Sequence, residues 1–354
     1  MGYTLYMASI LVDPHMQEQL HEEGLRYSSD SQLGFFRQKR GKLYDYYDLD
    51  GKKITDEQVL ERIRSLAIPP AWKNVWVCSK KNGHLQATGF DDKNRKQYIY
   101  HPDWIAITQE NKFAKMVDFG KALPKIRSKV RHDMGSETLN KQKILATVVW
   151  LLEHTFIRVG NEDYAKDNNS YGLTTLRNKH VDVKGSNITF QFRGKSGVEH
   201  ALSISNPTVS NTIKKCIELP GYQLFQYVDE NGDRHEIDSA DVNAFLKDVS
   251  SDDFSAKDFR TWGGSNLSAD FLHKAGQAEK KTEIKKVVNE MVKDVSSHLG
   301  NTTSVCRAYY IHPKIISSYE SSLLIPHYEK HAKEKNNPSG LSWNEHALIS
   351  LIEK

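Results

Sequence analysis

The most hydrophobic stretch of the chain leads directly into an arginine. The segment ILATVVWLLEHTFI, residues 144–157, has apolar side chains at the spacing of one buried helical face: Ile144, Leu145, Val148, Val149, Leu152 and Phe156. Arg158 follows at once, and Gly160 can end the helix. A guanidinium is always charged, so at the inner end of a buried helix it needs a countercharge. Arg158 is therefore expected to pair with an internal carboxylate or to face a bound anion.

Length and composition exclude several classes of protein. A chain of 354 residues is long enough for two domains. No window approaches the roughly 18 apolar residues of a membrane span, and the start, MGYTLYMASILVDPHM, carries neither a secretory nor a myristoylation signal. Cys78, Cys216 and Cys306 form no CxxC pair, which argues against a disulfide framework or a zinc site. We expect an intracellular, cytoplasmic protein without a membrane partner.

Positive charge is concentrated in one segment. The net charge of +4 favours an acidic partner only mildly. The segment GKALPKIRSKVRHD, however, carries five cations before its first acid: Lys121, Lys125, Arg127, Lys129 and Arg131. One dense basic segment is typical of a protein that binds a phosphate backbone. A solvated, charged loop explains this segment equally well.

The pattern of the chain predicts an α+β protein with a small β-rich amino-terminal lobe and a larger, mainly helical lobe. Residues 24–104 are rich in aromatics and turn signals, with one predicted helix. From about residue 106 the helical period dominates, interrupted by alternating apolar residues over 181–204 that predict a small antiparallel sheet. The expected domains are 1–105 and 106–330, followed by a tail, 331–354.

Metal and nucleotide motifs are missing from the sequence. No HExxH, Walker A or GxGxxG motif occurs, and no paired-carboxylate metal pattern. The segment DLDGKKITDE resembles a calcium loop, but its first ligand position is Tyr46, so a hairpin turn is expected there. We therefore expect any phosphate chemistry to proceed without a metal or other cofactor.

The remaining candidates for chemistry are cations and tyrosines. Arg260 lies one turn inside a helix that Ser255 and Asp258 can begin as a capping box. Lys195 lies in the turn GKSG, and a Tyr309–Tyr310 pair lies in LGNTTSVCRAYYIHP. Attack by a phenol on a phosphodiester builds charge on the non-bridging oxygens, which guanidiniums can stabilise. The departing 5′ oxygen needs a proton, which a lysine can donate. Taken singly, these residues are ordinary surface charges, structural arginines or interface aromatics.

Taken together, the motifs resemble the type IB DNA topoisomerases, in the short form of bacteria and poxviruses. They run over nearly the whole chain in the family's order: GLRYSSDSQLGFFR, IPPAW, LQATGFDDKNRKQYIYHPDW, RVGNEDYA, YGLTTLRNKHV, FRGKSG, KDFRTW and VCRAYYIHP. The resemblance implies that Arg158 and Arg260 stabilise the transition state and that Lys195 is the general acid. It also implies Tyr310 as the nucleophile. Asn301, nine residues before that tyrosine, stands where the family has histidine or asparagine.

The same resemblance implies how the chain meets its substrate. Residues of a strand-like ribbon would contact duplex DNA: Arg95, Lys96, Tyr98 and Tyr100. Tyr164 and the basic residues Lys125, Arg127, Lys129 and Arg131 are further candidate DNA contacts. A monomer would close its two lobes as a clamp around the duplex, associated with the nucleoid. It would relax positive and negative supercoils through a 3′-phosphotyrosine intermediate without ATP.

Two rival functions remain at this point. A tyrosine recombinase or integrase shares the arginine, lysine and tyrosine chemistry, but usually has His-x-x-Arg at the second arginine, where this chain has Lys257 before Arg260. Recombinases also tend to have a helical amino-terminal domain. A non-catalytic, architectural DNA-binding protein is the other rival, and the complete set of candidate residues argues against it. Asn301 could donate a hydrogen bond to phosphate or merely cap a helix.

Overall fold

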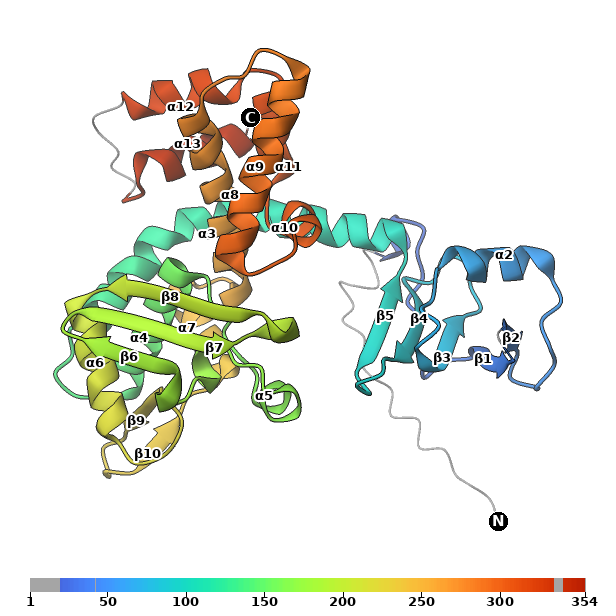
Figure 1. Cartoon of the computed structure of the whole chain (residues 1–354), viewed down its shortest axis with the longest axis horizontal. Coiled ribbons are helices and arrows are strands. Elements are labelled where there is room, and N and C mark those ends of the chain that lie inside the picture. The colour runs from blue at the N-terminus through green and yellow to red at the C-terminus, as the bar shows by residue number, and fades with distance from the viewer. Residues whose placement is uncertain (1–19, 42, 334–339, 354) are drawn as a thin grey trace. The chain divides into compact units, whose positions relative to one another are not determined.

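The computed structural model describes residues 20–41, 43–333 and 340–353, so the amino-terminal segment examined for targeting signals lies outside it (Figure 1). The chain divides between Lys112 and Phe113 into two compact units, called here the first and the second unit. Helix α3, Pro102–Met134, runs across this division and contains the expected domain boundary at residue 105. None of the described helices is long and apolar enough to cross a bilayer.

The first unit is mainly β, as predicted, and its described strands form one five-stranded antiparallel sheet. The strands are β1 (Gly34–Arg40), β2 (Leu43–Tyr47), β3 (Lys73–Cys78), β4 (Leu85–Phe90) and β5 (Lys96–Tyr100), in the order β2-β1-β3-β4-β5. Helix α2, Glu57–Ser65, contributes Ile63 to a small core with Val75, Val77 and Ala87. Because alternate residues of a strand face opposite sides, β5 keeps Ile99 against this core and exposes its neighbours on the other face.

The second unit is mainly helical and is built around α4, Lys141–Thr155. The predicted apolar face of this helix is confirmed, and Ala146 and Leu151 are buried as well, so α4 is enclosed on nearly all sides. Helix α8, Ala256–Ala275, packs against α4 and against α9, Lys281–Leu299. The other helices between α4 and the end of α9 are α5 (Glu162–Asn168), α6 (Pro207–Glu218) and α7 (Ser239–Ser250).

The predicted small sheet interrupts these helices. Strands β6 (Val181–Lys184), β7 (Asn187–Arg193) and β8 (Glu199–Ser205) form it in that order. The register pairs Arg193 with Glu199, so the GKSG turn projects from the end of the β7–β8 hairpin. Ser196 and Gly197 both have positive φ, 63° and 77°, which a turn this tight requires. A short hairpin that was not predicted, β9 (Gln226–Val228) and β10 (Arg234–Glu236), completes the strands.

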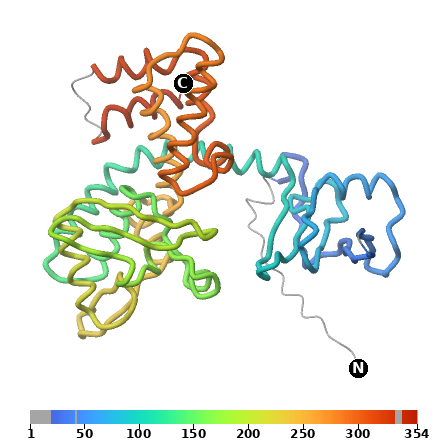
Figure 2. The backbone as a smooth tube through the Cα atoms, viewed as in Figure 1, coloured from blue at the N-terminus to red at the C-terminus, as the bar shows by residue number. Residues whose placement is uncertain are grey.

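The carboxy-terminal helices pack back onto α8 and α9. They are α10 (Thr303–Tyr309), α11 (Pro313–Glu320), α12 (Leu324–Ala332) and α13 (Trp343–Glu353), and Figure 2 follows the backbone through them. Helix α13 contacts α8, α11 and α12, and its Leu348 is fully buried. The segment expected as a tail therefore contributes a helix to the core of the second unit.

Candidate active site

The turn after α4 brings Arg158 to the surface of a pocket. The helix ends at Thr155, before the expected Gly160, because Phe156 takes a left-handed conformation (φ 53°) and its ring packs against Gly263 of α8. The chain then runs beside residues 172–174, where the Arg158 carbonyl accepts from Leu173 N–H at 2.8 Å. A Cβ at Gly172 would lie 2.5 Å from that carbonyl, so only glycine allows this approach.

Arg158 has no acidic partner among the residues that the structure describes. Its Nη2 donates to Oδ1 of Asn301, a neutral group, at 2.5 Å. Burial holds the pKa of Arg158 below its usual value, and the other groups that act on it are Tyr310 and Tyr164. Of the two expectations for this arginine, an internal carboxylate is thus excluded within the described part of the chain. The positive charge of Arg158 is therefore available to a bound anion.

Arg260 is a second guanidinium without a carboxylate. It is only 4% exposed, and it donates to two backbone carbonyls, those of Phe156 and, at 2.7 Å, Leu299. Burial, reinforced by the nearby charge of Arg158, lowers the pKa of Arg260 to about 10. Its Nε finds no hydrogen-bond partner among the described residues. Two neighbouring cations, one buried and one partly buried, are costly without an anion, so an anionic ligand would stabilise them strongly.

Asn301 contributes another unused donor beside the arginines. Its Oδ1 is held by Arg158, while its buried Nδ2 has no partner in the described chain. Asn301 does not cap the next helix: Thr302 does, by accepting from Val305 N–H. Gly300, in the left-handed conformation, ends α9. The backbone therefore fixes the asparagine between two helices with an N–H group directed at no protein atom.

Tyr310 lies just past the end of α10 and lines the pocket, whereas Tyr309 is 40% exposed and does not. The guanidinium carbon of Arg260 lies 5.1 Å from the centre of the Tyr310 ring. Helix α8 supports the backbone at this point: Ser265 Oγ donates to the Tyr310 carbonyl at 3.2 Å, and a Cβ at Gly264 would lie 2.6 Å from the same carbonyl. Glycine at position 264 is thus what lets the tyrosine approach α8.

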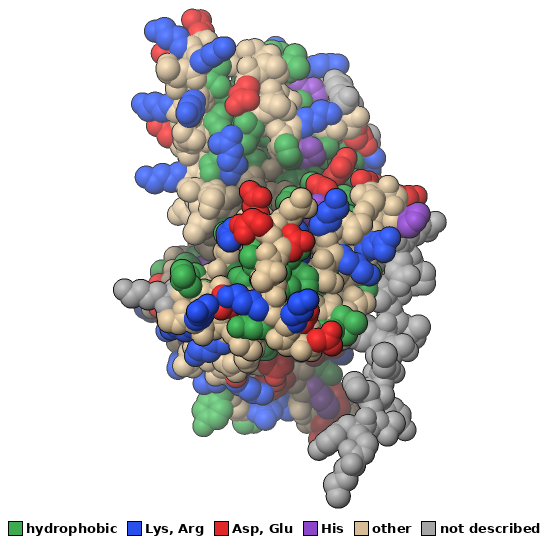
Figure 3. All heavy atoms as spheres, turned by 90° about the vertical axis from the view of Figure 1, so that its right-hand side faces the viewer, with side chains coloured by type: hydrophobic (Ala, Val, Ile, Leu, Met, Phe, Trp, Pro, Cys, Tyr) green, Lys and Arg blue, Asp and Glu red, His purple; other side chains and the backbone are tan. Residues whose placement is uncertain are grey.

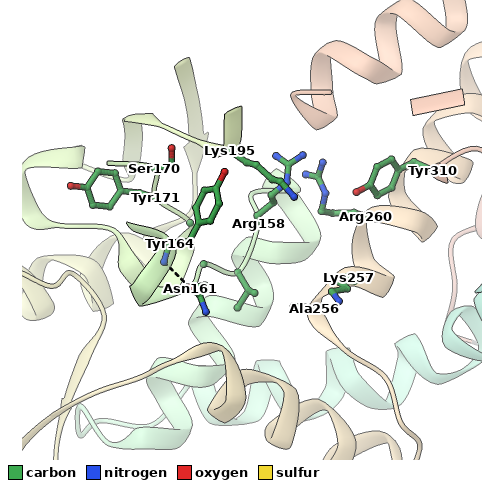
Figure 4. A pocket seen from close by; sticks show the side chains of 13 residues that line it. Arg158, Asn161, Tyr164, Ser170, Tyr171, Lys195, Ala256, Lys257, Arg260 and Tyr310 are labelled. Atoms are coloured by element: carbon green, nitrogen blue, oxygen red, sulfur yellow. Dashed lines mark hydrogen bonds between the residues drawn. The ribbon is translucent and has the colours of Figure 1, made fainter. Parts of the chain in front are cut away.

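Four of the five predicted catalytic residues line one pocket of the second unit, together with Tyr164, whereas Asn301 does not line it. The volume of this pocket is about 400 Å³. Figure 4 shows the two guanidiniums side by side, Lys195 reaching toward them from the β7–β8 turn and the Tyr310 ring on the other side. Its lining residues are Arg158, Val159, Gly160, Asn161, Tyr164, Ser170, Tyr171, Gly172, Lys195, Ala256, Lys257, Arg260 and Tyr310. Among the described residues, no group of three or more His, Cys, Asp or Glu is arranged to hold a metal ion.

Two residues near the site were not predicted as site residues: Lys257, named above only by comparison with recombinases, and His200. Lys257 lines the pocket one turn before Arg260, and its i, i+3 spacing from that arginine was the signal that could have identified it. His200 of β8 lies close enough to Arg158 and Arg260 for their charges to act on it, and burial and those charges keep its pKa below the usual value. In the sequence, His200 alternates with polar or small residues in step with Leu202 and Ile204, which predicts that its side chain faces the same side of the sheet as theirs.

Three of the four residues predicted to contact DNA from the first unit share one face of β5, whereas Arg95 lies just before the strand. Lys96, Tyr98 and Tyr100 are exposed there, and the two tyrosine rings stack at 6.0 Å. Lys96 also pairs with Asp30 at 2.6 Å, and Arg95 pairs with Asp91 at 2.6 Å. The ribbon therefore presents aromatic faces and partly neutralised cations.

The basic segment 121–131 is helical, as part of α3, and most of its charges are engaged within the protein. Arg127 binds Glu345 through both terminal nitrogens and Glu153 as well. Lys129 pairs with Asp133, and Lys125 donates a hydrogen bond to the Ser251 hydroxyl at 3.3 Å. Arg131 is exposed. The internal pairing makes Arg127 a structural residue.

Another basic surface lies on α9. Lys281, Lys285, Lys286 and Lys293 are exposed, and none has a carboxylate within ion-pair distance in the described part of the chain. Figure 3 shows Lys and Arg side chains gathered along its upper left edge, over the helices at the top of Figure 1. This basic surface was not predicted, since acids alternate with the lysines of α9 along the chain.

Two family models match the chain. Residues 102–337 match the model described as "Eukaryotic DNA topoisomerase I, catalytic core", and residues 43–91 match "Bacterial DNA topoisomerase IB, N-terminal domain". The two matches fall on the helical part and the β-rich part respectively. The β-rich match also separates the chain from the recombinases, for which a helical amino-terminal domain was expected.

Viral proteins are similar over most of their length. The DNA topoisomerase 1B of Acanthamoeba polyphaga mimivirus is 33% identical over 297 residues, which cover 82% of this chain and 88% of that protein. The DNA topoisomerase 1 of Rabbit fibroma virus (strain Kasza) is 25% identical, covering 82% and 91%. The DNA topoisomerase 1B of Vaccinia virus (strain Copenhagen) is 22% identical, covering 78% and 87%. On these matches and the helical and β-rich parts they cover, the chain belongs to the type IB DNA topoisomerase family.

Proposed function

We propose that this protein relaxes positive and negative supercoils in double-stranded DNA by cutting and resealing one strand through a 3′-phosphotyrosine at Tyr310. The observation that carries the proposal is the pair of guanidiniums, Arg158 and Arg260, that face a tyrosine ring without any described carboxylate beside them. A phosphodiester in the pocket supplies the missing negative charge. The unused donors, Arg260 Nε and Asn301 Nδ2, supply hydrogen bonds to its oxygens.

The chemical step follows from these groups. The Tyr310 oxygen bonds to phosphorus as the bond to the 5′ oxygen breaks, and the phenol proton passes to solvent. Negative charge grows on the non-bridging oxygens, where the two fixed guanidiniums and the Asn301 amide stabilise it. Because both arginines are already held by backbone carbonyls or by Asn301, they need no reorganisation during the reaction.

Lys195 would protonate the departing 5′ oxygen, which is a poor leaving group as an alkoxide. Its turn projects from the β7–β8 hairpin and its side chain extends toward the arginines (Figure 4). In the reverse step the 5′ hydroxyl attacks the phosphotyrosine and returns the proton to the lysine. The phosphotyrosine conserves the energy of the broken bond, so resealing needs no ATP. Rotation of the free 5′ end between the two steps would release supercoils.

We also propose that the two units act as a monomeric clamp on duplex DNA at the nucleoid, in the cytoplasm. Tyr98, Tyr100 and Lys96 of β5 would contact the duplex from the first unit. Tyr164, at the pocket, and the exposed lysines of α9 would contact backbone phosphates from the second unit. Arg127 is left out because its charge is neutralised by Glu153 and Glu345.

Plasmid relaxation in EDTA without ATP tests the proposal. Both positively and negatively supercoiled plasmids should relax, and a strict requirement for magnesium or ATP would contradict it. Trapping the protein on DNA by denaturation should yield an adduct with the 3′ phosphate. The variant Tyr310→Phe should form none, whereas Tyr309→Phe should form it normally because Tyr309 does not line the pocket. The opposite result would mean that the nucleophile is Tyr309.

A further inference from the structure

We propose that His200 is a positioning residue that keeps the turn carrying Lys195 at a fixed distance from the turn carrying Asn301. The inference rests on the proposed function, since it concerns the delivery of the proton to the leaving oxygen. Nothing in the motifs singled out from the sequence assigned a role to this histidine. Its place between two turns that bear catalytic residues is what suggests one.

The imidazole ring fills the space between two glycines. His200 pairs with Phe192 across β7 and β8, and the rings stack with centroids 4.9 Å apart and an angle of 10°. A Cβ at Gly194 would lie 2.6 Å from Cδ2 and Nε2 of the ring, and one at Gly300 would lie 2.6 Å from Cε1. The edge of the ring thus touches both backbones.

Each of these glycines directly precedes a residue of the proposed site. Gly194 comes before Lys195, and Gly300 comes before Asn301. The ring makes no hydrogen bond to any residue in the described ranges, so its contribution here is packing. Burial and the nearby arginines favour its neutral form, so it adds no further positive charge to the pocket.

The turn that carries Asn301 and the turn that carries Lys195 differ in the hydrogen bonds that hold them in place. Asn301 is bound by Arg158, and its own N–H donates to the Ser296 carbonyl at 3.0 Å. The Lys195 turn is held by bonds within the turn itself: Gly194 N–H to Val198 at 2.7 Å and Gly197 N–H to Gly194 at 3.1 Å. Loss of the ring should therefore free the lysine turn more than the asparagine turn.

The decisive experiment compares single-turnover cleavage of normal DNA with cleavage of DNA whose bridging 5′ oxygen is sulfur. A thiolate leaves with little need for a proton, because an ordinary thiol has a pKa near 8.5. With His200→Ala, cleavage of normal DNA should slow at least about tenfold. A general acid usually accelerates a reaction by about 10²–10⁴-fold, and a displaced lysine should lose part of that acceleration. On the sulfur substrate the rate should return to near that of the unaltered protein, with DNA affinity unchanged throughout. His200→Phe, which keeps a ring against Phe192, should recover part of the rate on normal DNA.

Matched variants distinguish a failure of the inference about His200 from a failure of the proposed role of Lys195. His235→Ala removes another imidazole stacked on a cross-strand aromatic, Tyr227, away from the pocket, and should cleave both substrates normally. An unchanged rate for His200→Ala on normal DNA would overturn the inference, and so would a slow rate that sulfur does not restore. Lys195→Ala tests the proposed function instead: if sulfur does not restore that variant, the lysine is not the acid, whatever His200 does.

Discussion

At the scale of single residues, the second unit contains two kinds of partly buried arginine. Arg127 is neutralised by Glu153 and Glu345, and its pKa is raised by them. Arg158 and Arg260 lie among neutral groups, and their pKa values are lowered. The first arrangement stabilises the fold. The second keeps positive charge available for a ligand at the expense of stability.

The two kinds should respond in opposite directions to the same substitution. Arg158→Gln removes a desolvated charge that repels Arg260, so the free energy of unfolding without DNA should rise by about 1 kcal/mol. Arg127→Gln leaves buried carboxylates unpaired and should lower it by about 3 kcal/mol. Urea denaturation of both variants measures the difference. A loss of stability in Arg158→Gln as large as in Arg127→Gln would contradict the distinction.

The sequence predicted the buried helix before Arg158, but it could not predict contacts between residues far apart in the chain. Spacing alone suggested that Arg158 follows a buried helix, and the helix is there. It could not show that Arg127 finds Glu345, because the partner lies far away in the chain. Nor could it show that His200 reaches Gly300, a contact that exists only after β8 and the end of α9 have packed.

At the scale of elements, α8 organises the site. It carries Arg260 and, one turn later on the same face, Gly264 against the Tyr310 backbone. Ser265 beside it donates to the Tyr310 carbonyl and accepts from His312 N–H at 3.0 Å. One helix therefore sets both a stabilising guanidinium and the backbone of the proposed nucleophile.

Gly264→Ala should separate these two functions of α8. The new methyl would meet the Tyr310 carbonyl, so Tyr310 must shift by a few tenths of an ångström or more. Displacement of a reacting group by about 1 Å can cost 10²-fold in rate, and adduct formation should fall toward that value. The overpacking cost of about 1–3 kcal/mol is partly offset because alanine favours the helix by about 1 kcal/mol.

Measurement of DNA affinity gives the control for Gly264→Ala. Affinity should stay normal because the phosphate contacts are untouched. A variant that binds DNA and forms the adduct at the normal rate would show that Gly264 does not position Tyr310.

Elements with strong periodicity were predictable, and those fixed by tertiary contacts were not. The β7–β8 hairpin follows from the alternation of Ile188, Phe190 and Phe192. The basic segment was considered as a loop, yet Leu123, Ile126 and Val130 have helical spacing and are buried. Helix α4 ends just before Phe156 because the Phe156 ring packs against Gly263 of α8. This tertiary contact cannot be predicted from the local sequence around Phe156.

At the scale of the whole molecule, all thirteen residues lining the pocket belong to the second unit. The β-rich first unit contributes none of them, although the two units were both foreseen from composition and periodicity. The proposed chemistry thus lies in the second unit and the proposed DNA contacts are divided between the two units, so the stability of the second unit limits the conditions under which the site can exist.

Acid should destabilise the second unit through two histidines. His180 Nδ1 accepts from Arg177 N–H at 3.0 Å, and His312 Nδ1 accepts from Lys314 N–H at 3.1 Å, which requires both rings to be neutral. Burial, aided by nearby cations, lowers the pKa of each to about 4. The unfolded chain binds these protons near pH 6.5, so it gains more protons than the folded chain between pH 6.5 and 4.

Stability should therefore be fully present above pH 6.5 and fall progressively as the pH drops toward 4, by an amount on the order of 3 kcal/mol per ring. Urea denaturation at pH 7, 6, 5 and 4 measures it. His312→Asn should flatten the pH dependence, because an asparagine oxygen can accept the same backbone N–H as a helix cap without taking up a proton. If His312→Asn loses stability with acid as steeply as the unaltered protein, the destabilising protons bind at other groups.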